Sequence, residues 1–181
     1  MKFNEEKQKL NKYLVQQRLK KALRVRVMTL AVFLFVPILA VLLIIFLSAS
    51  MHWMLWVISG FVGFFVAVVV VSSGWNLLRA YLVVANGRFS IQKDTFLRYE
   101  GETILKWTPH SVAAVFNFTM IEGKNSYCLR YHFSKYGKVD TCYRGLSYIS
   151  EGMEVYLIVL DGGTDAVVAP FFDARFYELS E

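Results

Sequence analysis

The hydrophobic pattern of the chain divides it into a membrane part and a soluble part. Two uncharged apolar runs, residues 27–47 and 53–75, are separated only by residues 48–52. A helix needs about 20 apolar residues to cross a bilayer core of roughly 30 Å. Neither run contains Lys, Arg, Asp or Glu. The pattern therefore predicts an integral membrane protein with two transmembrane helices, 27–47 and 53–75, and a short external loop, 48–52.

The segments that flank the two runs are also helical in character. Residues 3–26 contain no Gly or Pro and many good helix formers. We therefore predict that residues 1–26 form a basic cytoplasmic helix that can continue into the first span. After the second run the apolar character extends to Asn86-Gly87, where Gly suits a left-handed helix cap. Residues 76–87 are accordingly expected to be a helical stalk.

From residue 88 to residue 181 the pattern changes to period two, which is typical of β-strands. We predict a small all-β domain, an SH3-like or OB-like antiparallel barrel. A pleckstrin-type domain would end in an amphipathic helix, for which residues 171–181 are too short. Turn signals are expected at Lys93-Asp94, Glu100-Gly101, 122–125, Tyr136-Gly137 and 161–163. The predicted strands are 89–92, 95–99, 103–107, 111–119, 126–133, 138–144, 155–160, 167–170 and 176–179.

Residues 126–144 show the clearest alternation and predict a β-hairpin. One face collects apolar side chains, and the other collects charged residues and both cysteines. A three-residue loop, 135–137, with Gly in its left-handed third place predicts that Asp140 faces His132 and that Cys142 faces Arg130. A register shifted by two residues would place Cys128 opposite Cys142, but the turn chemistry favours the first. The charged residues of the outer face are the expected partner-docking residues: Arg130, His132, Asp140 and Arg144.

The same periodicity predicts one core that is complete within residues 88–181, so that this domain would fold alone. The apolar positions expected in that core are Phe89, Ile91, Tyr127, Leu129, Tyr131, Phe133, Tyr156, Ile158 and Leu160.

Small residues recur at intervals of four in the second apolar run, at Ser59, Gly63 and Ala67. This spacing places them on one helix face, where they let another helix approach closely. We expect the stripe to pack on the chain's own first span. Homodimerisation through the same stripe is the alternative.

The formal net charge of +6 is concentrated beside the membrane. Residues 1–26 hold nine Lys and Arg against two Glu, whereas residues 76–181 hold eleven basic against twelve acidic residues. Because basic flanks stay in the cytoplasm, both termini are expected to be cytoplasmic. Segment 1–26 is an ordinary topology signal or, less commonly, a surface for anionic lipid headgroups. A basic tail beside a membrane argues against nucleic acid as a partner.

Residues with catalytic or metal-binding chemistry are few. Cys128 and Cys142 are fourteen positions apart, which is not a CxxC spacing, and two cysteines are too few for a closed zinc site. In a reducing compartment we expect both to be free thiols. The sequence shows no phosphate-binding Gly-rich loop, GxSxG or HExxH motif. We therefore expect neither an enzyme nor a cofactor, with a thiol-based redox factor using Cys128 and Cys142 as the alternative.

A short apolar hairpin followed by a small β domain resembles the layout of NfeD-like bacterial membrane proteins. The resemblance is one of architecture and carries no residue roles. It agrees with our leading expectation, a membrane-anchored interaction module that docks a protein partner or forms a homo-oligomer. Neither apolar run contains an ionisable residue, which argues against a self-contained transporter. An accessory subunit of a transporter is the remaining alternative.

Overall fold

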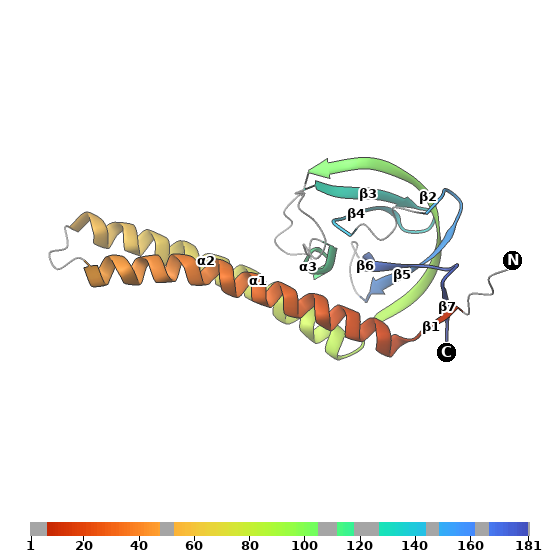
Figure 1. Cartoon of the computed structure of the whole chain (residues 1–181), viewed down its shortest axis with the longest axis horizontal. Helices are drawn as coiled ribbons and strands as arrows, with labels where there is room; N and C mark the ends of the chain where they lie inside the picture. Colours follow the sequence, from red (N-terminus) through yellow and green to blue (C-terminus); the bar gives the residue numbers. More distant parts are fainter. Residues whose placement is uncertain are drawn as a thin grey trace, which may run out of the picture.

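The computed structural model describes residues 7–47, 53–104, 112–117, 127–143, 149–161 and 167–180. Two long helices lie side by side as an antiparallel hairpin (Figure 1). A β domain packs against the end of the hairpin that lies near both chain termini, and the other end extends well beyond it.

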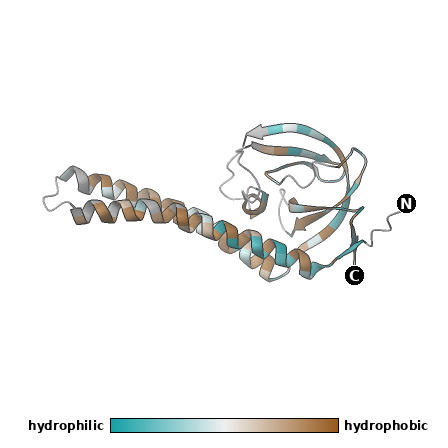
Figure 2. Ribbon diagram, viewed as in Figure 1, coloured by the Kyte–Doolittle hydropathy of each residue, from teal (hydrophilic) through white to brown (hydrophobic). Residues whose placement is uncertain are grey.

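The two helices are α1, Lys12–Leu47, and α2, Trp53–Ala85. Both are long and apolar enough to cross a membrane. Their extension beyond the β domain is mainly hydrophobic in Figure 2, and many of its large apolar side chains are exposed. As predicted, the basic segment continues without a break into the first apolar run. The predicted external loop, 48–52, lies outside the described residues.

The start of α1 differs from the prediction, because the helix begins only at Lys12. Asn11 caps it: the Leu14 N–H donates to the Asn11 side-chain oxygen at 2.7 Å. The preceding residues form a short strand, β1 (Gln8–Leu10), which pairs in parallel with β7 (Tyr177–Leu179). The two ends of the chain are therefore joined by backbone hydrogen bonds, which no local pattern in the first ten residues indicates.

Helix α2 continues beyond the second apolar run and ends just before Gly87, the position at which the sequence predicts a helix end. Helix α2 ends at Ala85, and Gly87 has a φ of 62° in the left-handed region. The Arg88 N–H donates to the Val83 carbonyl at 2.9 Å and the Gly87 N–H to the Val84 carbonyl at 3.2 Å, which is a Schellman cap. The Gln16 amide of α1 also donates to the Val84 carbonyl at 2.7 Å, so α1 helps to terminate α2.

The first two predicted strands and the start of the third are one continuous strand, β2 (Phe89–Ile104), and residues 105–107 lie outside the described residues. The predicted turns at Lys93-Asp94 and Glu100-Gly101 are therefore wrong. The register of β2 against its neighbour shifts between Phe96 and Arg98 and again between Tyr99 and Gly101, where Gly101 has a φ of 109°. Such irregularities bend a strand. Bending lets the two halves of β2 pair with different strands.

Within the described residues, four further strands belong to the sheet: β3 (Tyr127–Phe133), β4 (Gly137–Thr141), β5 (Glu154–Leu160) and β6 (Val167–Asp173). Together with β7, they confirm the last five predicted strands in type and approximate position. The prediction of a strand at 111–119 is wrong, because Val112–Asn117 forms a short helix, α3. Residues 112–117 carry two Ala, and three of their apolar side chains are buried.

The prediction of a closed barrel is also wrong. The described strands form an open antiparallel sheet in the order β4-β3-β2-β5-β6. The sheet curls, as the long curved β2 in Figure 1 shows, but its edge strands β4 and β6 are not paired with each other. Side chains alternate along the strands with a period of two, as in a barrel, and only pairing between the two edge strands would distinguish a closed barrel from this open sheet.

Asn117, the last residue of α3, connects the two edges of the open sheet. Its side-chain amide donates to the Val167 carbonyl and its side-chain oxygen accepts from the Ala169 N–H, both at 2.8 Å. Its backbone carbonyl accepts from the Cys142 N–H at 2.7 Å and from the Thr141 hydroxyl at 3.1 Å. One buried residue thus bonds β6 through its side chain and the end of β4 through its backbone.

The described residues form two hydrophobic cores, whereas one was predicted. The first, which we call the sheet core, lies inside the curled sheet. It consists of Phe96, Leu129, Tyr131, Phe133, Val139, Val155, Leu157, Val167 and Phe171. The second, which we call the interface core, lies between the sheet and the helices. It consists of Leu10, Val15, Leu19, Ala22, Leu23, Ala80, Val84, Phe89, Ala113, Val115, Phe116, Ile158, Leu160, Val168 and Phe172.

The interface core contradicts the prediction that the core is complete within residues 88–181. Leu10, Val15 and Leu19 are fully buried in it, and so are Ala80 and Val84 of α2. Strand β5 alternates between the cores and is buried on both faces. Burying a side chain such as Leu19 contributes roughly 1.5–3 kcal/mol. The helices therefore supply part of the β domain's own core.

The register of the β3–β4 hairpin is the alternative one. Phe133 pairs with Gly137 and Arg130 with Asp140. The buried carboxylate of Asp94 on β2 accepts the Lys135 N–H at 3.1 Å and the Tyr136 N–H at 3.2 Å. The predicted turn at Lys93-Asp94 gives Asp94 no contact with residues 135–136, whereas in the structure it binds their backbone from a neighbouring strand. A contact between strands, and not the turn sequence alone, selects this register.

Candidate functional site

The outer face of the β3–β4 hairpin gathers most of the chemistry predicted from the sequence. Three cross-strand pairs follow one another along it: Cys128 with Cys142, Arg130 with Asp140, and His132 with Lys138. The structure thus brings together three of the four predicted partner-docking residues. The fourth, Arg144, lies outside the described residues.

Arg130 and Asp140 form a two-pronged ion pair. Arg130 Nε donates to Asp140 Oδ1 at 2.6 Å, and Arg130 Nη2 donates to Oδ2 at 2.7 Å. The hydrogen bonds to Asp140, and then its charge, raise the pKa of Arg130 above its ordinary value. Both side chains are about one-third exposed, so solvent weakens the pair. The geometry fixes the orientation of both groups on the outer face.

Glu100 of β2 is the centre of a larger cluster. Lys138 Nζ lies 2.9 Å from Glu100 Oε2, and Arg98 Nη2 donates to Oε1 at 3.0 Å. His132 Nδ1 lies 3.3 Å from Oε1. The hydrogen bonds from Lys138, followed by those from Arg98, lower the pKa of Glu100 to about 2. The carboxylate is only 15% exposed, so its neighbours reach the solvent more easily than it does.

Sequence reasoning missed the central carboxylate because Glu100 was placed in a turn. A reading of residues 96–104 as one strand would have put Arg98 and Glu100 on the same face, since side chains two apart point the same way. Lys138 lies on the charged face of the predicted hairpin, but the alternation alone does not indicate that it contacts β2. The cluster depends on pairing of β2 with β3, which is a long-range contact.

The cluster and the neighbouring ion pair leave an excess of positive charge. They hold three permanent cations, Arg98, Arg130 and Lys138, and two carboxylates, Glu100 and Asp140. The side chains of Arg98 and Lys138 are 60% and 56% exposed. Because both carboxylates are already engaged by cations, this surface suits an acidic partner better than a basic one.

Cys128 and Cys142 are in contact, contrary to the favoured register. Their Sγ atoms are 2.9 Å apart and both are free thiols. Cys128 is buried although it belongs to the outward-facing set, whereas Cys142 is partly exposed. Burial, followed by the hydrogen bond with Cys142, raises the pKa of Cys128 well above its ordinary value. The pair is placed for a disulfide, but Cys128 is a weak nucleophile.

The small-residue stripe of α2 is exposed in this single chain. Gly63 and Ala67 are exposed and Ser59 is half-buried. A Cβ added at Gly63 would meet no atom within 4 Å. The stripe therefore shows no close helix contact at Gly63, and its role in helix packing stays a prediction. Within the described ranges, no three His, Cys, Asp or Glu side chains are grouped as a metal site.

Comparisons with models of known families, with characterised proteins and with solved structures gave no significant match. The likeness to NfeD-like proteins therefore stays a likeness of layout, two apolar helices beside a β-sheet domain.

Proposed function

We propose that this protein is a membrane-anchored interaction module whose β domain docks a protein partner at the cytoplasmic face of the bilayer, alone or within a larger membrane complex. In this proposal residues 27–47 and 53–75 span the membrane and both termini are cytoplasmic. The observation that carries the proposal is the interface core, which joins the β domain to the two long helices without a flexible tether. The outer face of the β3–β4 hairpin therefore keeps a fixed orientation relative to the bilayer.

Basic residues of α1 strengthen this junction. Lys12 Nζ lies 5.3 Å from the centre of the Phe89 ring. The Arg18 guanidinium lies 5.2 Å from the Phe172 ring and 6.0 Å from the Tyr177 ring. Each such cation–π contact contributes roughly 0.5–1 kcal/mol at an exposed position. Part of the basic segment thus serves to fix the domain as well as to mark the cytoplasmic side.

Binding, and not catalysis, is the activity we infer for the outer face. Its carboxylates are held by cations, Glu100 by Lys138 and Arg98 and Asp140 by Arg130. A general base or acid needs a pKa near the working pH, and that of Glu100 is about 2. The exposed cations instead suit electrostatic recognition of an acidic segment on a partner protein.

Charge reversal at Lys138 tests partner docking. The full chain would be purified in mild detergent with its bound proteins, and each bound protein would be quantified by mass spectrometry. Lys93→Glu is the matched control, because Lys93 is also an exposed lysine beside a carboxylate, at 2.6 Å from Glu154. We expect Lys138→Glu to reduce the amount of a co-purified partner protein by about tenfold or more, since like charges in an interface cost several kcal/mol. Equal retention by both variants would reject the outer face as the docking surface.

Reporter fusions test the membrane topology. Both flanks of the apolar hairpin are basic, so reporters at residue 1 and residue 181 should read cytoplasmic. A reporter inserted at Ser50 should read external. A split between the two ends of the chain would overturn the topology.

A thiol-based redox role is a second candidate, favoured by the contact between Cys128 and Cys142. The more exposed Cys142 would react with a hydroperoxide, releasing an alcohol and leaving a sulfenic acid. The Cys128 sulfur would then displace the hydroxyl as water and form the disulfide. Two electrons pass from the thiols to the peroxide.

Peroxide treatment followed by alkylation and mass measurement tests this candidate. The parent should lose two alkylatable thiols, and Cys142→Ser should leave Cys128 alkylatable after unfolding. Because Cys128 is buried and its pKa is raised, we expect oxidation to be slow. A pair that stays fully reduced would eliminate the redox candidate and leave the interaction module unaffected.

A further inference from the structure

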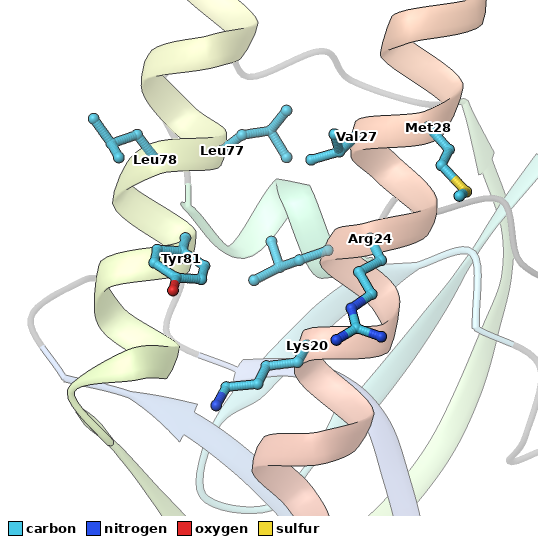
Figure 3. Close-up of a pocket in the computed structure, with 8 residues that line it drawn as sticks. Lys20, Arg24, Val27, Met28, Leu77, Leu78 and Tyr81 are labelled. Atoms are coloured by element: carbon cyan, nitrogen blue, oxygen red, sulfur yellow. The ribbon is translucent and has the colours of Figure 1, made fainter.

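A groove lies between α1 and α2, where the charged part of α1 meets the first apolar run and where the second apolar run ends. We call it the boundary groove (Figure 3). Its volume is about 620 Å³, within the roughly 300–1,000 Å³ typical of small-molecule sites. It is lined by Lys20, Leu23, Arg24, Val27, Met28, Leu77, Leu78 and Tyr81.

The two ends of the boundary groove differ in chemistry. Lys20 and Arg24 are four residues apart on α1, so they lie one above the other on one helix face. With the Tyr81 hydroxyl they form a polar, basic end. The other end is apolar: it includes Val27, the first residue of the uncharged run, and Leu77, close to the end of the second run.

The basic end has no acidic neighbour on the helices that form it. Neither α1 nor α2 contains an Asp or Glu. Among the described residues, Lys20 and Arg24 take part in none of the ion pairs. Lys12 and Arg18, by contrast, lie over aromatic rings of the β domain. Lys20 and Arg24 are thus two exposed cations at the basic end of the boundary groove.

The groove opens on the side of the hairpin away from the β domain. Figure 3 shows Val27 and Leu77 pointing toward each other between the two helices, with α3 behind them. Leu23, which is buried, forms the floor, whereas Val27, Met28 and Leu78 are exposed. The occupant therefore comes from the surroundings, and at this level of the proposed membrane the surroundings are the lipids of the cytoplasmic leaflet.

We propose that the boundary groove binds one anionic glycerophospholipid of the cytoplasmic leaflet. The lipid phosphate lies between Lys20 and Arg24, and an acyl chain follows the apolar end toward Met28. This inference rests on the proposed membrane insertion of the two helices. Charge complementarity at one end and apolar lining at the other match an amphiphile, whereas a soluble anion would leave the apolar end unfilled.

Native mass spectrometry of the full chain in non-ionic detergent tests the proposal. The protein is titrated with phosphatidylglycerol, with phosphatidylcholine and, separately, with inorganic phosphate. We expect one retained phosphatidylglycerol, with weaker retention of the zwitterionic lipid. Inorganic phosphate at the same concentration as the lipid should not displace phosphatidylglycerol. If it did, the acyl chain would contribute nothing to binding, and the proposal would be overturned.

Matched charge variants locate the site. The double variant Lys20→Gln/Arg24→Gln should raise the phosphatidylglycerol concentration needed for half-saturation by about 30-fold. This factor corresponds to the loss of two cations that each contribute about 1 kcal/mol. Lys9→Gln/Lys21→Gln removes the same charge outside the groove lining and should change the midpoint by less than about threefold. Equal effects of the two double variants would show unspecific attraction and would overturn the site.

A groove-filling variant keeps the test valid if the charge variant folds poorly. Leu78→Trp leaves all cations in place and should also reduce lipid retention by about tenfold or more, because it occupies the space of the acyl chain. Unchanged retention in Leu78→Trp would reject the groove. Partner docking is tested at Lys138, which does not line the groove, so either proposal can fail while the other stands.

Discussion

At the scale of single residues, Asn117 shows how one buried side chain can connect strands that are not neighbours in a sheet. Its amide satisfies a carbonyl and an N–H of β6 while its own carbonyl accepts from the end of β4. An open sheet has two edges with unpaired backbone groups. Asn117 covers part of each edge.

Replacing Asn117 by Ala should therefore destabilise the protein markedly. The change leaves the Val167 carbonyl and the Ala169 N–H without their partner in a buried position. Each unsatisfied group costs about 1–3 kcal/mol, so the two groups together should cost roughly 2–6 kcal/mol. Chemical denaturation in detergent measures it. Gln17→Ala, which removes an exposed amide on α1, is the control and should stay within about 0.5 kcal/mol of the parent.

Glu100 gives a pH-dependent prediction. Its pKa in the folded protein is about 2, below the ordinary 4.5, because Lys138 and Arg98 donate hydrogen bonds to the carboxylate. A carboxyl with a lowered pKa contributes stability above its unfolded pKa, and that contribution is lost as the pH falls through the folded pKa. Glu100→Gln should therefore lower the melting temperature at pH 7, and the difference from the parent should shrink between about pH 4.5 and pH 2.

Thermal melts at a series of pH values measure this effect. Glu151→Gln, at an exposed position outside the cluster, is the control and should show little change at neutral pH. A Glu100→Gln difference that stayed constant down to pH 2 would contradict the ion-pair explanation.

At the scale of elements, the junction between helices and sheet decides how the parts are arranged. Helix α1 carries two apolar surfaces in succession: Val15 and Leu19 face the β domain, and the uncharged run beyond Val27 is largely exposed. The Gln16 side chain and the glycine cap then end α2 so that β2 can start directly beside the helices. Connection and packing thus act together to orient the domain.

Truncation of Leu19 tests the junction. Leu19 is fully buried in the interface core, so Leu19→Ala should cost about 2–5 kcal/mol. The matched control is Leu82→Ala on α2, because Leu82 is 48% exposed and outside both cores. Denaturation of the full chain in detergent compares them. If the two variants had the same free energy of unfolding, the helices would not be part of the domain's core.

At the scale of the whole molecule, the β domain and the helical hairpin form one structural unit. Strand β1 pairs with β7, and residues of α1 and α2 complete the interface core. The isolated fragment 88–181 loses β1 and the helices, and it exposes the apolar side chains of Phe89, Ile158 and Phe172. Exposed patches of this kind cause association or aggregation in soluble proteins.

We therefore expect fragment 88–181 to aggregate or to bind a hydrophobic dye when expressed alone, in contrast to the independent folding predicted from periodicity. Dye fluorescence and size-exclusion chromatography measure this. Full-length protein in detergent is the control. A monomeric fragment with a cooperative melt and no dye binding would show that the sheet core alone is sufficient.

The sequence by itself determined the features that depend on local periodicity and composition. The two apolar runs, the end of α2 at Gly87 and the division of Leu129, Tyr131 and Phe133 from Arg130 and His132 follow from helix length, glycine conformation and side-chain alternation. These properties act over a few residues, so the sequence of one chain is enough to infer them.

Only the tertiary structure decided the features that depend on contacts between distant residues. Asp94 sets the hairpin register from another strand and thereby brings Cys128 to Cys142. Pairing of β2 with β3 creates the Glu100 cluster. Residues 112–117 are helical because the apolar side chains of α3 are buried in the interface core. The start of α1 faces the sheet for the same reason, since Val15 and Leu19 are buried there. Packing can override local propensity, because the free energy of burying these side chains exceeds the small differences between local conformations.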